Sequence, residues 1–283
     1  MTTRPVIYRK AANWLLNLLA VSSICIALGG MGWILYTVVC HGAPVLNLEF
    51  FTAPSKPYGE PCAGIANALL GTLLMTLGAT VLAVPPALAG GIYLAEFGKH
   101  SKLADVLRFC ANVMMGVPSI LVGLFVYALM VVPMGQFSGM AGTVALAIIM
   151  FPVVMRTTED MLLMVPDTLR ESALALGMSR MRATLSIVAR SARNGLATGV
   201  LLSLARVSGE TAPLLFTALF ADTWPAAFFT EPTASAPVLI TEYTTNSPFE
   251  SMHAMGWGAA LVMAVFILVI NIVTRCIFYE NKH

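Results

Sequence analysis

Long runs without a charged residue limit this chain to a membrane protein. Residues 11–48, 61–95 and 109–155 contain no Asp, Glu, Lys or Arg. A helix needs about 20 apolar residues to cross the hydrocarbon layer of a bilayer, and each run is long enough for at least one crossing. Because 58% of all residues are hydrophobic and only 11% are charged, the chain lies outside the range of soluble globular domains. The expected fold class is all-α, as a polytopic membrane protein.

Turn residues divide these runs into about six membrane-spanning helices. The run 109–155 is too long for one crossing, and its segment PMGQFSGMAG (133–142) predicts a tight hairpin between two helices. The first run is too long for a signal peptide, so we count it as a helix. The expected crossings are an apolar core at 14–39, then 61–95, two helices within 109–155, 194–221 and 254–274.

The basic residues predict the orientation. With six crossings both ends lie on one side, and fourteen of the sixteen basic residues fall there, whereas Lys56 alone lies in a connection on the other side. Because Lys and Arg are enriched in cytoplasmic loops, both termini are expected to be cytoplasmic. The fourteen residues are Arg4, Arg9, Lys10, Lys99, Lys102, Arg108, Arg156, Arg170, Arg180, Arg182, Arg190, Arg193, Arg275 and Lys282.

Two charged residues interrupt the expected fifth crossing. Arg206 and Glu210 lie on either side of the middle of segment 194–221, where a charge costs at least ~2.5–3.5 kcal/mol. Being four positions apart, they share one face of a helix and partly neutralise each other. One interpretation is a structural ion pair that holds helices together. The other is a polar lining for the path of a charged substrate.

The residues around Arg206 and Glu210 favour the second interpretation, a path for a charged substrate. Small residues such as Ala205 and Gly209 leave room for a cavity, and Pro213 is expected to kink the helix by freeing the carbonyl of Gly209. Broken backbone at membrane depth is tolerated only where it is buried in protein or lines a wet cavity. A guanidinium, with its five fixed donors, suits a tetrahedral oxyanion. The candidate residues of an anion path are Arg206, Glu210, Ser208 and Thr211.

The longest basic connection, 156–193, predicts a helix, a glycine turn and a second helix. Pro166 suits the first turn, and Leu169, Ala173 and Leu176 then share one face before Gly177 closes the helix. A second amphipathic helix begins near residue 179. Such a hairpin either rests on lipid head groups or docks into a partner protein, and its periodicity is compatible with both.

The chain carries no motif for ATP hydrolysis or metal binding. Its only Gly-Lys pair, at Gly98, lacks the other residues of a phosphate-binding loop, so an energy source would have to be a separate subunit. The five cysteines have no metal-ligand spacing, and a disulfide between Cys40 and Cys62 is left open. We expect no cofactor, metal or nucleic acid on this chain. The alternatives to a transport subunit driven by a separate energy-supplying subunit are an ion-coupled secondary transporter and a membrane enzyme.

The segment ESALALGMSRMRATLSI (171–187) resembles a motif of the membrane subunits of bacterial ABC importers. The motif is Glu-Ala-Ala, three residues, Gly, nine residues, Ile; Glu171, Ala173, Gly177 and Ile187 match it, and Ser172 replaces the first alanine. This resemblance implies the type I ABC importer permease fold. It also implies that residues 166–177 form a coupling helix, in which Glu171, Ala173 and Gly177 contact a separate ATPase that binds ATP and magnesium.

Four further segments are similar to the A-type permease subunits of phosphate-specific transport (Pst) systems. They are GIYLAEFGK (91–99), VPSILVGLFVY (117–127), RTTEDML (156–162) and GETAPLLFTAL (209–219). The resemblance implies a permease for inorganic phosphate in a bacterial inner membrane, with Arg206 and Glu210 important for passage. Another oxyanion, such as sulfate, molybdate or phosphonate, is the alternative substrate.

The same resemblance implies partners and a division of the chain. The partners are a related C-type permease chain, an ATPase dimer, a periplasmic phosphate-binding protein and membrane lipid. Residues 1–60 are expected to form the cytoplasmic N-terminus, the first crossing and the start of a periplasmic loop. Residues 61–278 are expected to form the transmembrane domain with five helices, and 279–283 a cytoplasmic tail.

Overall fold

The computed structural model describes residues 6–57, 60, 64–99 and 101–279, and this part of the chain contains helices and no strand. The long helices are α1 (Val6–Gly42), α3 (Ala66–Ile92), α4 (Lys102–Gly116), α7 (Gly139–Leu163), α10 (Ala189–Val207) and α13 (Glu250–Tyr279). The shorter α-helices are α2 (Leu48–Thr52), α5 (Ser119–Val126), α6 (Val132–Met134), α8 (Asp167–Ala175), α9 (Arg180–Ala183), α11 (Ala212–Leu215) and α12 (Ala236–Thr241). A 3-10 turn, η1 (Ala43–Val45), and four π-helical segments, η2 (Tyr93–Phe97), η3 (Tyr127–Val131), η4 (Thr184–Val188) and η5 (Glu242–Asn246), complete the described chain.

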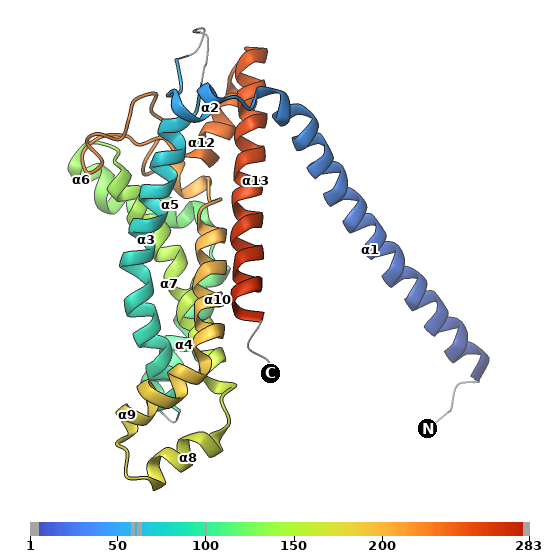
Figure 1. The fold of residues 1–283 in the computed structure, drawn as a ribbon, viewed down its shortest axis with the longest axis vertical. Helices are drawn as coiled ribbons and strands as arrows, with labels where there is room; N and C mark the ends of the chain where they lie inside the picture. The colour runs from blue at the N-terminus through green and yellow to red at the C-terminus, as the bar shows by residue number, and fades with distance from the viewer. Residues whose placement is uncertain (1–5, 58–59, 61–63, 100, 280–283) are drawn as a thin grey trace.

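Helices α3 and α7 pack side by side and form the centre of the bundle (Figure 1). Their backbones approach closely because glycines lie at the contact. A Cβ added to Gly78 would lie 2.8 Å from the methyl carbon of Thr143, and one added to Gly91 would lie 2.6 Å from the carbonyl oxygen of Met155. Around this contact lies a core of buried apolar residues, including Met75 and Met150. Small residues at helix contacts are typical of membrane proteins.

The expected crossings are confirmed at four helices. The segments 12–45, 66–97, 139–163 and 250–276 are long and apolar enough to cross a membrane. Helix α4 and the bent segment that follows it, from α5 to α6, count as a fifth crossing if together they form one broken span. The expected hairpin at 133–142 is present between α6 and α7, with Gly135 in a left-handed conformation. Helix α10 does not meet the same criterion, since Arg190, Arg193 and Arg206 fall among its 19 residues.

The expected helix over 194–221 is wrong at both ends. Helix α10 begins at Ala189 and ends at Val207, and a separate short helix, α11, follows from Ala212. The amide nitrogens of Gly209 and Glu210 bond to carbonyls three residues back, which tightens the last turn. Pro213 therefore does not kink a continuous helix. It lies in the first turn of α11, where a missing N–H is tolerated.

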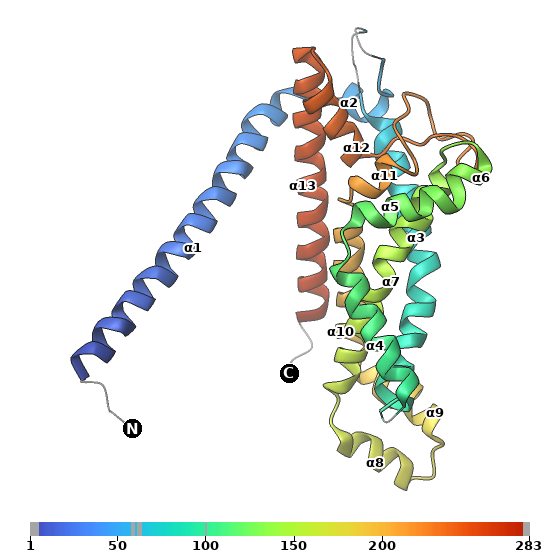
Figure 2. The same cartoon turned by 180° about the vertical axis from the view of Figure 1, so that it is seen from behind.

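Helix α1 stands apart from the bundle and meets it only near its C-terminal end (Figure 2). There the rings of His41 and Trp257 lie 5.4 Å apart, and a Cβ on Gly42 would come within 2.6 Å of the Trp257 carbonyl oxygen. Most of α1 exposes large apolar side chains, among them Trp14 and Trp33. A surface of this kind must be covered by lipid or by another chain.

Two connections at the upper end are tied together by Asn67, which is fully buried at the start of α3. Its amide nitrogen donates to the hydroxyl of Ser55 at 2.8 Å and to the carbonyl of Ala221 at 3.0 Å. The Ser55 hydroxyl in turn donates to the carboxylate of Asp222 at 3.1 Å. Burial raises the pKa of Asp222. These hydrogen bonds therefore hold the connection at residue 55 against the connection at residues 221–222, although the two lie far apart in the sequence.

We expect Gly91→Ala to destabilise the protein. The added methyl group would lie 2.5 Å from Cβ of Thr158 and would push α3 away from α7, and overpacking of this kind typically costs ~1–3 kcal/mol. A matched control is Gly30→Ala in α1, where a Cβ would meet nothing within 4 Å. The measurement is thermal unfolding of the purified protein in detergent. Equal melting temperatures for the two variants would contradict the close contact of α3 with α7.

Candidate polar cavity

A cavity lies on the side of α7 where two chain breaks meet. Helices α4 and α5 are bent by 102° relative to each other at Val117 and Pro118, and α10 ends at Val207. A cavity of about 290 Å³ lies between these breaks and α7. Its lining consists of Met114, Met115, Val117, Pro118, Ser119, Val122, Ile148, Ile149, Val153, Arg206 and Glu210. Non-helical backbone at membrane depth is expected at such a place.

Arg206 and Glu210 both reach this cavity and are only loosely paired. Nε of Arg206 lies 3.9 Å from Oε1 of Glu210, at the limit of an ion pair. The arginine side chain is 56% exposed and the glutamate side chain 17% exposed. Because α10 ends between them, the pair does not share a helix face as expected from its spacing. The guanidinium therefore keeps most of its donors free for another acceptor.

Of the other two candidates, Ser208 does not face the cavity and Thr211 is not part of its lining. Ser208 is buried, and its hydroxyl donates to the carbonyl of Ala205 at 2.8 Å, so it caps the end of α10. Thr211 directly precedes α11, and its carbonyl accepts the amide of Leu214. Of the four residues predicted for the path, Arg206 and Glu210 therefore line this cavity and Ser208 and Thr211 do not, because the chain turns where a helix was expected.

The start of α5 adds a second anion-attracting group to the cavity. Pro118, which caps the start of α5, and Ser119, the first residue of α5, belong to the lining. The first amide groups of a helix have no partner within the helix, and the helix dipole makes this end positive. An anion in the cavity would therefore meet both a guanidinium and the positive end of a helix. The bend at residues 117–118 produces this arrangement, and the sequence analysis missed it.

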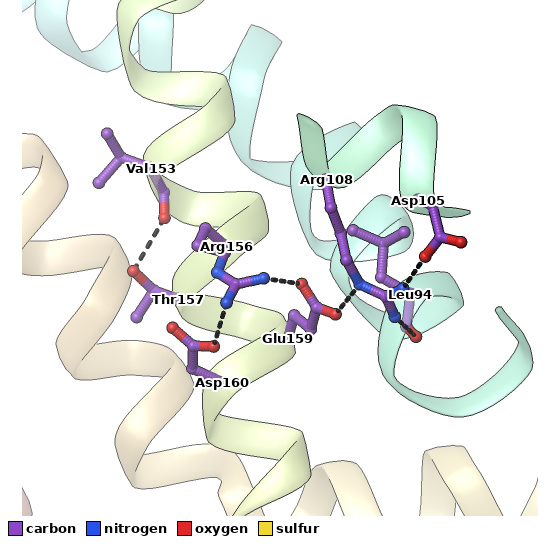
Figure 3. Close-up of polar contacts among 8 residues, drawn as sticks. All are labelled: Leu94, Asp105, Arg108, Val153, Arg156, Thr157, Glu159 and Asp160. Atoms are coloured by element: carbon purple, nitrogen blue, oxygen red, sulfur yellow. Dashed lines mark hydrogen bonds and ion pairs between the residues drawn. The ribbon is translucent and has the colours of Figure 1, made fainter. Parts of the chain in front are cut away.

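A buried carboxylate lies below the cavity on α7. Glu159 is 1% exposed and accepts from Nε of Arg108 at 2.6 Å and from Nη1 of Arg156 at 2.8 Å (Figure 3). Arg108 belongs to α4, so the bonds join α4 to α7. Two exposed carboxylates extend the network, Asp105 to Arg108 at 3.1 Å and Asp160 to Arg156 at 3.5 Å. Two arginines thus hold the carboxylate of Glu159 in place.

A helix, α8, nine residues long, lies within the predicted segment 166–177, at the lower end of the molecule (Figure 1). Glu171 is exposed, Ala173 is buried and Gly177 has a left-handed backbone with φ of +82°. Leu169 and Leu176, expected on one face with Ala173, are exposed instead. The amide of Met178 bonds to the carbonyl of Ala173, and that of Gly177 to Leu174, which closes the helix with a glycine cap.

The described residues contain no group of His, Cys, Asp and Glu side chains arranged to hold a metal ion. Cys40 is exposed and free, and Cys62 lies outside the described residues.

Known proteins similar to this chain are transport permeases. A family model for the inner membrane component of binding-protein-dependent transport systems matches residues 87–279. The phosphate transport system permease protein PstA of Haemophilus influenzae is 42% identical over 275 residues, which are 97% of this chain and 96% of that protein. A probable phosphate transport system permease protein PstA of Methanocaldococcus jannaschii is 38% identical over 245 residues, which are 86% and 85% of the two chains.

Two solved structures show the same fold. One is the inward-facing MetNI methionine ABC transporter, with a TM-score of 0.63 and 17% identity over 76% of this chain and 95% of that chain. The other is a bacterial alginate ABC transporter in complex with a periplasmic protein, with a TM-score of 0.60 and 12% identity over 96% of both chains. This chain thus has the fold of ABC importer permeases, and it belongs to the family of binding-protein-dependent transport system inner membrane components.

Proposed function

We propose that this chain is a membrane-spanning permease subunit of an ATP-driven importer of inorganic phosphate. The observation that carries the proposal is that Arg206 and the start of α5 face one cavity between broken helices. The relatives named as phosphate permeases, 42% identical over nearly the whole chain, support phosphate as the substrate. Helix starts that point at anionic substrates recur in transporters built from broken helices.

Glu210 supports phosphate over the other oxyanions. Hydrogen phosphate carries a proton that a carboxylate can accept in a hydrogen bond, whereas sulfate is fully ionised near neutral pH and would be repelled. With Glu210 3.9 Å from Arg206, one tetrahedral anion can contact both side chains.

A second, related permease chain completes the pathway. In the single chain more than half of the Arg206 side chain is exposed, so the cavity is open on one side. A permease of the C type would close it, and this chain would then form half of the path. Helix α1, whose apolar window is 0% buried, provides further surface for that chain or for lipid.

A separate ATPase dimer, which binds ATP and magnesium, docks at α8. This helix projects from the lower end of the molecule (Figure 2). Leu174 on it is 48% exposed, and Leu176 directly after it is 84% exposed. Apolar side chains exposed in this way at a helix end favour a protein partner. Glu171, Ala173 and Gly177 then belong to the coupling helix, and the ATP-hydrolysing activity belongs to the partner.

The proposed location is the inner membrane of a bacterium, with both termini in the cytoplasm. Helix α1 starts, and α13 ends, toward the end of the molecule that carries α8 and α9 (Figure 1). Lys99, Arg170 and Arg180 lie at that same end, in or near the surroundings of α8. Since basic residues favour the cytoplasmic side, the opposite end would face a periplasmic phosphate-binding protein.

Substitution of Arg206 tests the function. Arg206→Gln removes the charge that attracts the anion, so uptake of labelled phosphate into vesicles containing the whole complex should fall at least tenfold. Arg206→Lys keeps the charge without the forked donors, so its loss should be smaller. Arg275→Gln removes an exposed arginine from the end of α13 and serves as the control, with uptake near that of the unmodified complex.

The double variant Arg206→Gln with Glu210→Gln separates the path from a structural ion pair. Breaking a buried pair by removing one partner costs ~3–5 kcal/mol, and removing both charges relieves that cost. A structural pair would therefore be rescued by the double change. We expect an assembled complex that does not transport, and normal uptake in this variant would refute the path.

Substitutions in α8 test the docking of the ATPase. Gly177→Pro is incompatible with a φ of +82°, and Glu171→Lys reverses an exposed charge on the helix. Both should leave the subunit in the membrane while much less ATPase co-purifies and uptake falls. Glu231→Lys, an exposed charge reversal outside α8, is the control. Full recovery of the ATPase with either α8 variant would show that α8 only rests on lipid.

A further inference from the structure

The π-helical segment η2, between α3 and α4, receives polar contacts from three arginines of other elements. Arg108 of α4 donates to the carbonyl of Leu94 at 3.0 Å. Arg170 of α8 donates to the carboxylate of Glu96 at 2.9 Å, and Arg180 of α9 donates to the carbonyl of the same residue. The Arg180 guanidinium also lies 5.1 Å from the centre of the Phe97 ring. Four elements, η2, α4, α8 and α9, therefore meet at six residues.

The bond between Glu96 and Arg170 joins η2 to the proposed ATPase-docking helix. The two side chains are 5% and 12% exposed, so neither charge has bulk water as an alternative partner. Arg170 also donates to the carbonyls of Leu162 at 2.7 Å and Val165 at 2.5 Å, at the end of α7. Any rotation of α8 about its own axis must therefore move η2 and the end of α7, or break buried bonds.

Arg108 continues the connection from η2 to the cavity. Besides the carbonyl of Leu94, it binds buried Glu159 on α7 at 2.6 Å (Figure 3). Arg108 lies on α4, whose last turn places Met114 and Met115 in the lining of the cavity that holds Arg206. A displacement of η2 is thus passed to the helix that shapes the cavity, through bonds that are partly or fully shielded from water.

The geometry of η2 leaves it able to change shape. Its carbonyl at Tyr93 accepts the amide of Gly98, five residues on, at 2.8 Å, which is the π-helical pattern. Such turns are rare and are frequent at functional sites. A cavity of about 340 Å³ lies beside the bond from Arg170 to Glu96, with Lys99 and Arg180 also in its walls. This space leaves room for η2 and α8 to move together.

Resting on the function proposed above, we propose that η2 is the relay between the ATPase and the anion path. Movement of α8 is passed through the bond from Arg170 to Glu96 into η2, and through the bond from Arg108 to Leu94 into α4. The cavity then opens or closes with the nucleotide state of the ATPase. Glu96 and Arg108 are positioning residues in this scheme, since they do not line the cavity themselves.

The test is Glu96→Gln in the whole complex, reconstituted with its ATPase. The amide keeps the size of the side chain and one acceptor but loses the charge that holds Arg170. We expect the complex to assemble and to hydrolyse ATP within twofold of the unmodified rate, while phosphate transported per ATP falls at least tenfold. Asp105→Asn is the matched control, because it removes an exposed carboxylate, 74% accessible, from Arg108. Its transport ratio should not change.

A reporter cysteine makes the result independent of what is transported. In a complex whose permease has no other cysteine, Met115→Cys lies in the wall of the cavity. Its rate of modification by a thiol reagent should change at least threefold between the nucleotide-free and ATP-bound complex, and Glu96→Gln should abolish that change. If ATP changes the modification rate of Met115→Cys in the complex that keeps Glu96, but that complex takes up no phosphate, the proposed substrate is wrong and the relay is supported.

The double variant Glu96→Gln with Arg170→Gln covers the case in which the single variant does not assemble. It removes both buried charges, so assembly should be restored while the relay stays interrupted. Normal transport per ATP in an assembled single or double variant would overturn the proposal. A failure of both variants to assemble would also overturn it, because the contact would then be purely structural. The proposal would also be overturned if ATP changed the modification rate of Met115→Cys equally with glutamate and with glutamine at position 96.

Discussion

The structure depends on the absence of water at membrane depth. Every backbone N–H and C=O there needs a partner in the protein, and an unpaired group is costly. A helix satisfies this need internally, which is why α3 and α7 run unbroken through the bundle centre. The breaks at 117–118 and 208–211 are exceptions, and residues of both segments border one cavity. The constraint that forces most of the chain into helices therefore also indicates that the two breaks, beside the polar cavity, have a function.

Two kinds of arginine–carboxylate pair occur in the described bundle, and their burial separates them. Glu159 and Glu96 are 1% and 4% exposed, and each accepts charged hydrogen bonds shorter than 3.0 Å. Arg206 and Glu210 are 3.9 Å apart, with the arginine 56% exposed. Removing one partner of a buried pair costs ~3–5 kcal/mol, whereas an exposed pair contributes little. The buried pairs therefore hold helices in position, and the open pair can exchange its partner for an anion without a large loss.

Local composition predicted the four long apolar helices and the hairpin near Gly135, because each depends only on residues close in sequence. The end of α10 at Val207 was not predictable in the same way, since Gly209 and Pro213 are compatible with a kinked helix and with a broken one. Tertiary packing decides between them: a Cβ on Gly123 of α5 would lie 2.7 Å from Cα of Pro213. The buried pairs were missed because their partners are 51 and 74 positions apart.

The single chain leaves two surfaces uncovered, and the two need different partners. Helix α1 carries a long apolar surface of which none is buried, and lipid alone can cover such a surface. The cavity cannot be completed by lipid, because hydrocarbon beside Arg206 would leave a guanidinium without acceptors. A polar surface from another protein, water or the anion itself can face that side of the cavity. In the complex proposed above, a second permease chain would supply the surface and leave the anion as the exchangeable partner, which is the condition a transport path requires.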